Sequence, residues 1–151
     1  MNRHSRLLGN DPDSVQVQQE RGQRAFCSNR GRRGGCGRTV SIFLAGVLPR
    51  HSVPSWLLTQ LLTDLLGGAS VQAAAQSFGG VFALETVYRI RQRVRCRLGG
   101  VRVCLCREAK PPACALADPL LQTVRHLQAV FGAAVDLVAA FQLRFQCAFL
   151  G

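Results

Sequence analysis

Three pairs of adjacent glycines divide the middle of the chain into short segments. The pairs are Gly67-Gly68, Gly79-Gly80 and Gly99-Gly100, and glycine is unfavourable inside a helix but common just after its end. Between the pairs, apolar residues recur every three to four positions, which is the period of a helix with one buried face. The glycine pairs therefore predict three short helices, over about residues 55–66, 70–78 and 83–98.

A further helix is predicted after the Pro111-Pro112 linker. Asp118 is a good N-cap, and Pro119 occupies the first helical position. The apolar residues that follow step by four and three in alternation, which is the pattern of a coiled-coil seam; they are Leu120, Val124, Leu127, Phe131, Ala134, Val138, Phe141 and Phe145. This seam predicts either packing on the preceding helices or a homodimer through residues 118–145, with a kink or break at Gly132.

Residues 1–25 are polar and show no helical period. They predict a loop, or two weak strands, that leads to Phe26. The segment "TVSIFLAGVL" from Thr39 is β-branched and apolar, which fits a strand or the start of a buried segment.

The charge of the chain is strongly basic and unevenly distributed. There are 19 Lys and Arg residues against 8 Asp and Glu residues, a formal net charge of +11, and all of the cations except Lys110 are arginine. Residues 111–151 are neutral, so the excess lies in the first 110 residues. Because the planar guanidinium matches phosphate and guanine edges, the excess favours a nucleic-acid partner. A GC-rich genome, which favours arginine codons, is an alternative origin.

Residues 70–91 carry the pattern that is most specific for DNA binding. Ala75 lies four residues before Gly79, and this spacing allows two helices to cross closely at a tight turn. The second helix would then place its first turns in the major groove. An ordinary three-helix bundle with a solvated basic face is the structural alternative.

The polar residues of that second helix are the candidate DNA contacts. Glu85, Thr86 and Arg89 face away from the apolar row and would reach base edges. Two basic stripes follow along the helix, one of Arg89, Arg93 and Arg97 and one of Arg91 and Arg95. Such dense stripes repel themselves unless they are solvated or matched by phosphate.

The segment "GASVQAAAQSFGGVFALETVYRIRQRV" resembles the helix-turn-helix of bacterial insertion-sequence transposases and their relatives. "FC…CGRTVSIF" is similar to the closing half of the zinc ribbon that precedes that module in the family. The resemblance covers about residues 26–97. It departs from the family pattern in a turn one residue longer and in a cysteine pair separated by eight residues instead of two.

This resemblance implies a metal site at Cys27 and Cys36, beside phosphate-binding arginines at Arg30, Arg32, Arg33 and Arg38. A structural zinc needs four ligands, but residues 1–26 contain no cysteine and only one histidine, His4. We therefore expect no cofactor, with zinc bound only if an upstream ligand pair exists. The cysteines at 96, 104, 106 and 114 have no metal-ligand spacing and predict buried or incidental thiols.

Together these patterns predict a mainly α protein. A small irregular or β zinc-ribbon-like segment (1–48) would precede a three-helix helix-turn-helix module (50–100), a linker (101–117) and a C-terminal helix (118–150). No catalytic constellation is evident, so we expect no enzyme. The apolar run 130–150 is interrupted by polar residues, which predicts a buried helix and not a membrane span.

The expected function is binding of double-stranded DNA, either sequence-specific or directed to the backbone, by a transposase-like module without its nuclease domain. Alternatives are a small transcriptional regulator that uses the same module, or a non-functional remnant or protein-interaction scaffold. With no secretory signal at the start of this sequence, the expected location is the cytoplasm, in association with the nucleoid.

Overall fold

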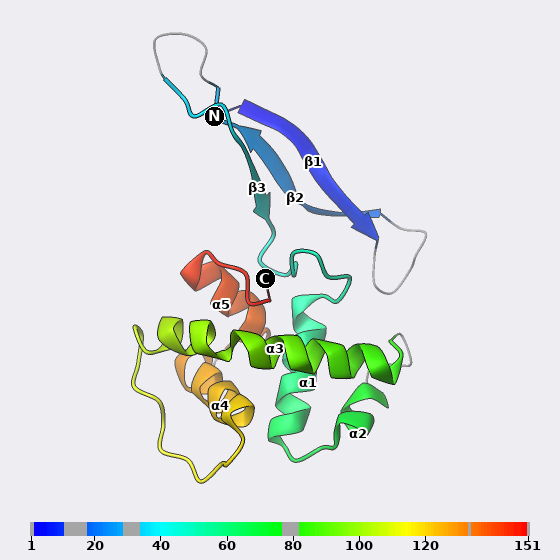
Figure 1. Ribbon diagram of the computed structural model, residues 1–151, viewed down its shortest axis with the longest axis vertical. Coiled ribbons are helices and arrows are strands. Elements are labelled where there is room, and N and C mark those ends of the chain that lie inside the picture. Colours follow the sequence, from blue (N-terminus) through cyan, green and yellow to red (C-terminus); the bar gives the residue numbers. More distant parts are fainter. Residues whose placement is uncertain (1, 11–17, 29–33, 77–81, 133, 151) are drawn as a thin grey trace.

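The computed structural model describes residues 2–10, 18–28, 34–76, 82–132 and 134–150. Three strands form one antiparallel sheet in the order β1-β2-β3: β1 (Asn2–Asn10), β2 (Gln18–Phe26) and β3 (Thr39–Phe43). They are followed by α1 (Ser55–Leu66), α2 (Val71–Gln76), α3 (Leu84–Leu105), α4 (Pro119–Phe131) and α5 (Leu137–Phe145). The sheet projects from one end of the helical body (Figure 1). The protein is thus mixed α and β, and the prediction of a mainly α fold is wrong.

The sheet is held together mainly by its backbone. In the described part of β2, only Gly22 and Ala25 are buried, and all five residues of β3 are exposed. Gly22 pairs with both neighbours, opposite Leu7 and opposite Phe43. A Cβ on Gly22 would lie 2.1 Å from the carbonyl oxygen of Ile42, so glycine is what permits β3 to approach. Residues 2–10 and 18–26 are strands, so of the two alternatives that the sequence left open for this segment, two weak strands is the one that is confirmed and the loop is wrong.

The first two helices follow the predictions from the glycine pairs. α1 spans the predicted residues 55–66 and ends at Gly67. Ser70 accepts a hydrogen bond on its Oγ from the Ala73 amide (3.1 Å) at the start of α2. The Gly79-Gly80 pair lies outside the described residues.

α3 is longer than predicted because it continues through Gly99 and Gly100. Val101 and Leu105 extend its buried row by two more turns. Both glycines are exposed on the helix surface. Each glycine costs about 1 kcal/mol of helix stability relative to alanine, whereas burying a Val or Leu side chain contributes about 1.5–3 kcal/mol. Packing therefore overrides the glycine pair.

The predicted C-terminal helix is two helices, α4 and α5, separated near Gly132. Asp136 explains the separation, because it caps α5 by accepting from the Ala139 amide (2.9 Å) and also accepts from the hydroxyls of Thr59 (2.7 Å) and Ser55 on α1. The seam faces inward: five of its residues are at most 2% exposed, namely Leu120, Val124, Leu127, Val138 and Phe141. The alternative of packing inside the chain is therefore the one that the structure adopts.

The helices form one core that differs from the predicted helix-turn-helix module. α1 packs against α4 and α5 as well as α2, and α3 lies along α2 and α4 (Figure 1). The predicted module of three helices is therefore wrong, because α4 and α5 complete the core around α1. Among the described residues, no helix is both long and apolar enough to cross a membrane.

Residues 44–54 join the sheet to the helical core. Arg21 of β2 donates from Nη2 to the carbonyl oxygens of Leu48 (3.2 Å) and His51, and its own carbonyl accepts from Leu44 N–H (3.0 Å). From α5, Gln142 donates to the carbonyl oxygen of Val47 (3.0 Å). Residues 44–54 therefore contact both β2 and α5.

Candidate nucleic-acid interface

The arginines of α3 fall on two sides of the helix. Its buried row consists of Val87, Ile90, Val94, Val101 and Leu105. Because successive residues are rotated by about 100°, the arginines divide around this row. Arg91, Arg95 and Arg102 form the α4 flank. Arg89, Arg93 and Arg97 form the loop flank, which is named for the contact of Arg93 with His51 in residues 44–54.

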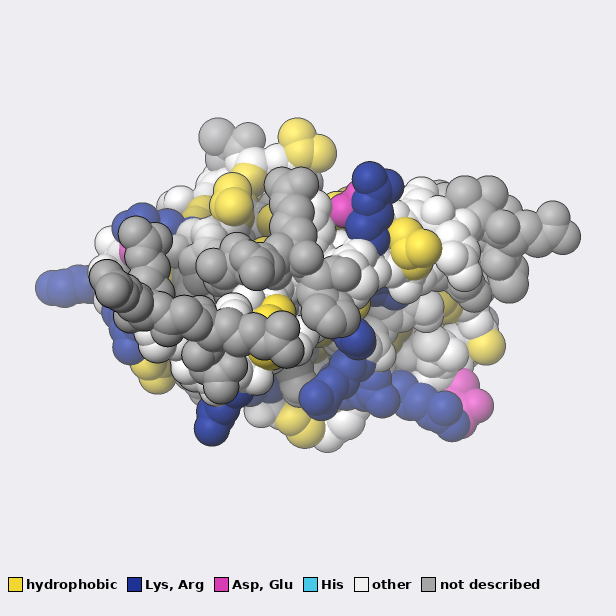
Figure 2. All heavy atoms as spheres, turned by 90° about the horizontal axis from the view of Figure 1, so that it is seen from above, with side chains coloured by type: hydrophobic (Ala, Val, Ile, Leu, Met, Phe, Trp, Pro, Cys, Tyr) yellow, Lys and Arg dark blue, Asp and Glu magenta, His cyan; other side chains and the backbone are white. Residues whose placement is uncertain are grey.

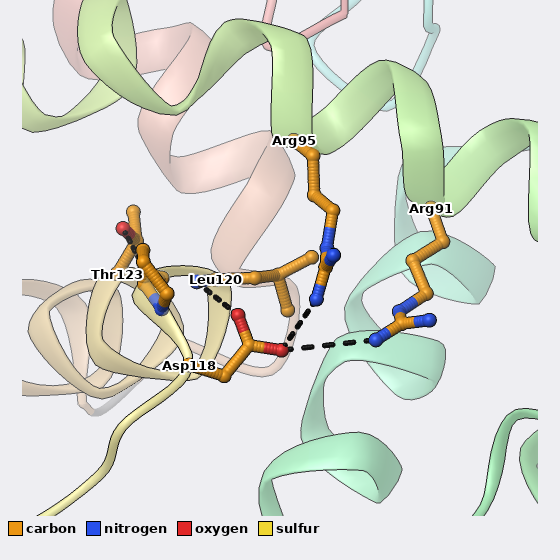
Figure 3. Close-up of polar contacts among 6 residues, drawn as sticks. Arg91, Arg95, Asp118, Leu120 and Thr123 are labelled. Atoms are coloured by element: carbon orange, nitrogen blue, oxygen red, sulfur yellow. Dashed lines mark hydrogen bonds and ion pairs between the residues drawn. The ribbon is translucent and has the colours of Figure 1, made fainter.

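Asp118, the N-cap of α4, holds two arginines of the α4 flank. Figure 3 shows Arg91 and Arg95 reaching down from α3 toward this carboxylate, with N–O distances of 3.7 and 2.7 Å to Oδ2. The other oxygen, Oδ1, accepts from the Leu120 amide (2.9 Å), which is the cap that the sequence predicted. Arg102 donates to the side chain of Gln122 (2.6 Å). This flank therefore fastens α3 to α4.

The environment of Asp118 favours its ionised form. Burial by itself would raise the pKa of this carboxyl group. The hydrogen bond from Leu120 N–H and the contacts with Arg95 and Arg91 outweigh burial and lower the pKa. Asp118 is therefore a carboxylate at neutral pH and neutralises part of the α4 flank.

The loop flank has no such carboxylate at its centre. Arg93 donates to Nδ1 of His51 (3.0 Å), since a guanidinium has no acceptor. Burial, the charge of Arg93 and the charge of Arg21 all lower the pKa of His51. Arg21, His51 and Arg93, from β2, the connecting loop and α3, form what we call the junction cluster. Within the described ranges, no ion pair includes Arg21, Arg93 or Arg97.

Arg89 and Arg97, at the two ends of the loop flank, have different neighbours from Arg93 at its centre. Arg89 pairs with Glu85 one turn earlier (2.5 Å), and both side chains are largely exposed. Thr86 is half-buried beside them. At the other end, the charge of Arg97 acts on Cys147, although burial and Cys104 raise the pKa of that thiol overall. Figure 2 views the molecule of Figure 1 from above, and dark blue side chains lie along its lower edge. This edge corresponds to the front of Figure 1, where α3 lies.

The arginines predicted to bind phosphate from the N-terminal part are mostly outside the described residues. This applies to Arg30, Arg32 and Arg33. Arg38 is described and exposed, and its carbonyl oxygen accepts from the Cys27 amide (2.9 Å). Its side chain remains a candidate phosphate contact beside the sheet.

Cys27 and Cys36 lie side by side, as a metal knuckle would require. The Cys36 amide donates to Cys27 Sγ (3.4 Å), and this bond together with one from the Cys36 side chain lowers the pKa of Cys27. However, among the described residues no three His, Cys, Asp or Glu side chains gather into a group that could hold a metal ion. Two thiols do not make the closed four-ligand site of a structural zinc.

Sequence reasoning missed two members of the junction cluster. Arg21 lies in a segment for which the sequence predicted a loop or two weak strands, and His51 was not among the residues predicted to bind DNA. No local pattern indicates their role, because His51 is 42 positions from Arg93. Only the pairing of β2 with β3 and the course of residues 44–54 bring them together.

Comparison of the chain with protein-family models, curated proteins and solved structures gives no match. The resemblance to transposase modules therefore rests on the quoted sequence segments alone.

Proposed function

We propose that this protein binds double-stranded DNA by contacts between its loop flank and the phosphate backbone. The observation that carries the proposal is the junction cluster: Arg21, His51 and Arg93 come from three separate elements and have no carboxylate among them. The two guanidinium charges of Arg21 and Arg93 both act on His51 and lower its pKa, and a bound phosphate would offset this excess of positive charge. Arg97 extends the cationic surface by one helical turn.

Backbone contacts fit this surface better than base readout. Arg89, the arginine nearest the start of α3, is already paired with Glu85, which leaves fewer groups for base edges. Arg93 and Arg97 have no carboxylate partner among the described residues, so their guanidinium groups can form the bidentate contacts that arginine makes with phosphate oxygens. A transposase-like or regulatory role in the nucleoid would use the same surface, without the helix-turn-helix geometry that the sequence predicted.

A titration of labelled duplex DNA tests the proposal. Arg93→Ala with Arg97→Ala should weaken binding at low salt by roughly 10-fold or more, since phosphate contacts supply most non-specific affinity. Arg125→Ala is the matched control, because Arg125 is an exposed arginine on α4 whose side chain forms one hydrogen bond among the described residues, to Gln128 (3.4 Å). The proposal fails if the folded wild type shows no affinity at low salt, or if the control weakens binding equally.

Self-association is a second candidate function, favoured by the position of β3 as an edge strand of the sheet in the described part of the chain. Residues 39–49 contain no charged residue, although the chain carries a net charge of +11. Two copies paired antiparallel about Ser41 would place Val40 opposite Ile42, a favourable cross-strand pair, without like charges across the edge. Sedimentation should then show a dimer that Ile42→Lys converts to a monomer. A monomeric wild type at high concentration would remove this candidate.

A further inference from the structure

Two thiols, those of Cys27 and Cys36, lie in the connection between β2 and β3. Cys27 follows the last residue of β2, and Cys36 lies three residues before β3. Two backbone hydrogen bonds close the loop at this point: Cys27 N–H to the Arg38 carbonyl and Gly37 N–H to the Cys27 carbonyl, both 2.9 Å. Thiols that are nine positions apart in the sequence are thereby held next to each other.

Gly35 and Cys36 form a close-fitting support for the Cys27 sulfur. The Cys36 amide donates to Cys27 Sγ at 3.4 Å. A Cβ on Gly35 would lie 2.0 Å from the Ser28 carbonyl oxygen and 3.0 Å from Cys27 Sγ, so only glycine lets the backbone come this near. An N–H aimed at a sulfur stabilises the thiolate, which is the form that reacts with disulfides.

We propose that Cys27 and Cys36 form a thiol–disulfide exchange site that takes small-molecule disulfides as its oxidant. Cys27 is the attacking thiol, because its sulfur receives the hydrogen bond. Cys36 is the resolving thiol, because it is exposed and adjacent. The flanking backbone hydrogen bonds keep the two thiols adjacent, which is the arrangement that an S–S bond of about 2.05 Å requires.

The exchange proceeds in two steps that balance. The Cys27 thiolate attacks one sulfur of the disulfide, the S–S bond breaks, and one small thiolate leaves. Cys36 gives its proton to solvent and attacks Cys27 Sγ, and the second small thiolate leaves. The two protein thiols lose two electrons to the small disulfide, whose two thiolates take up the protons according to their pKa values.

The other close thiol pair provides an internal contrast. Cys104 and Cys147 also interact, but burial is the largest influence on Cys147 and raises its pKa. That pair lacks an amide aimed at the sulfur among the hydrogen bonds of the described residues. The two pairs should therefore react at different rates in one molecule.

The experiment treats the full chain with oxidised glutathione at neutral pH and maps the products by mass spectrometry. Trypsin can cleave after the arginines at 30, 32 and 33, so a bridge appears as two peptides linked by a disulfide. We expect the 27–36 bridge to form first, and roughly 10-fold faster than a 104–147 bridge. Cys36→Ser should stop at a glutathione adduct on Cys27, and Cys106→Ser should change nothing.

A Gly35→Ala variant keeps both thiols and tests the support directly. The added methyl group must displace the Ser28 carbonyl, so the bridge should form more slowly while the Cys106 thiol reacts as before. The inference is overturned if the wild type accumulates no 27–36 bridge, if the 104–147 bridge forms first, or if Gly35→Ala leaves the rate unchanged.

Discussion

The two flanks of α3 carry the same residue type at the same spacing, yet they have different surroundings. On the α4 flank, Arg91 and Arg95 share the carboxylate of Asp118. On the loop flank, Arg93 contacts a histidine whose pKa is lowered, and Arg97 has no ion pair among the described residues. The comparison teaches that an arginine stripe becomes a structural contact or a binding surface according to what a distant part of the chain places beside it.

The largest expected effect is a loss of folding stability when Asp118, the shared partner of the α4 flank, is replaced. Asp118→Ala removes an N-cap, which contributes about 1 kcal/mol, and two partly exposed ion pairs, which contribute about 0.2–1 kcal/mol each. We expect the free energy of unfolding to fall by about 2 kcal/mol in urea denaturation. Asp118→Asn, which keeps an acceptor for the Leu120 amide, should lose about half as much. An alanine variant as stable as the wild type would show that the α4 flank is not structural.

The second effect is the pH dependence of stability. The pKa of Asp118 is lowered in the folded protein, so its contribution is complete above the unfolded pKa of about 3.9. It is lost as the pH falls through the lower folded pKa. Between about pH 5 and pH 2 the wild type should therefore lose more stability than Asp118→Asn. Parallel curves for the two proteins would mean that Asp118 gains nothing from its arginines.

The smallest effect is on the pH dependence of DNA binding, through His51. Its pKa is lowered in the free protein by burial and by two arginines, and a bound phosphate would raise it again. Proton uptake then accompanies binding, so affinity should increase a few-fold as the pH falls from about 7.5 to 5.5. His51→Asn should flatten this dependence relative to the wild type. If the variant shows the same dependence, the phosphate does not contact the junction cluster.

The sequence predicted those parts of the fold that local signals determine. The glycine pair after Leu66 correctly predicted the C-terminus of α1, and the cap at Asp118 correctly predicted the N-terminus of α4. Where long-range contacts decide, the sequence was less informative. It predicted the polar strands β1 and β2 only as an alternative to a loop, because they pair mainly through their backbone. It ended α3 too early, because Val101 and Leu105 are buried beyond Gly99 and Gly100.

The sequence divided the arginines of α3 into two stripes, but it did not show that the stripes have different roles. Arg91 and Arg93 are two positions apart and cannot be told apart from the sequence, because their roles depend on Asp118 and His51. Asp118 was recognised as a cap, but its ion pairs with α3 have no local signature. The different roles of the two flanks could therefore be assigned only from the tertiary structure.

The most direct test compares the salt dependence of DNA binding in two double variants, Arg93→Gln with Arg97→Gln and Arg91→Gln with Arg95→Gln, at a temperature where both are folded. Each lost phosphate contact reduces the slope of log K against log salt by about 0.9. The account predicts a reduction of about 1.8 for the loop-flank variant and less than about 0.5 for the α4-flank variant. Equal reductions, or a larger one for the α4 flank, would contradict it.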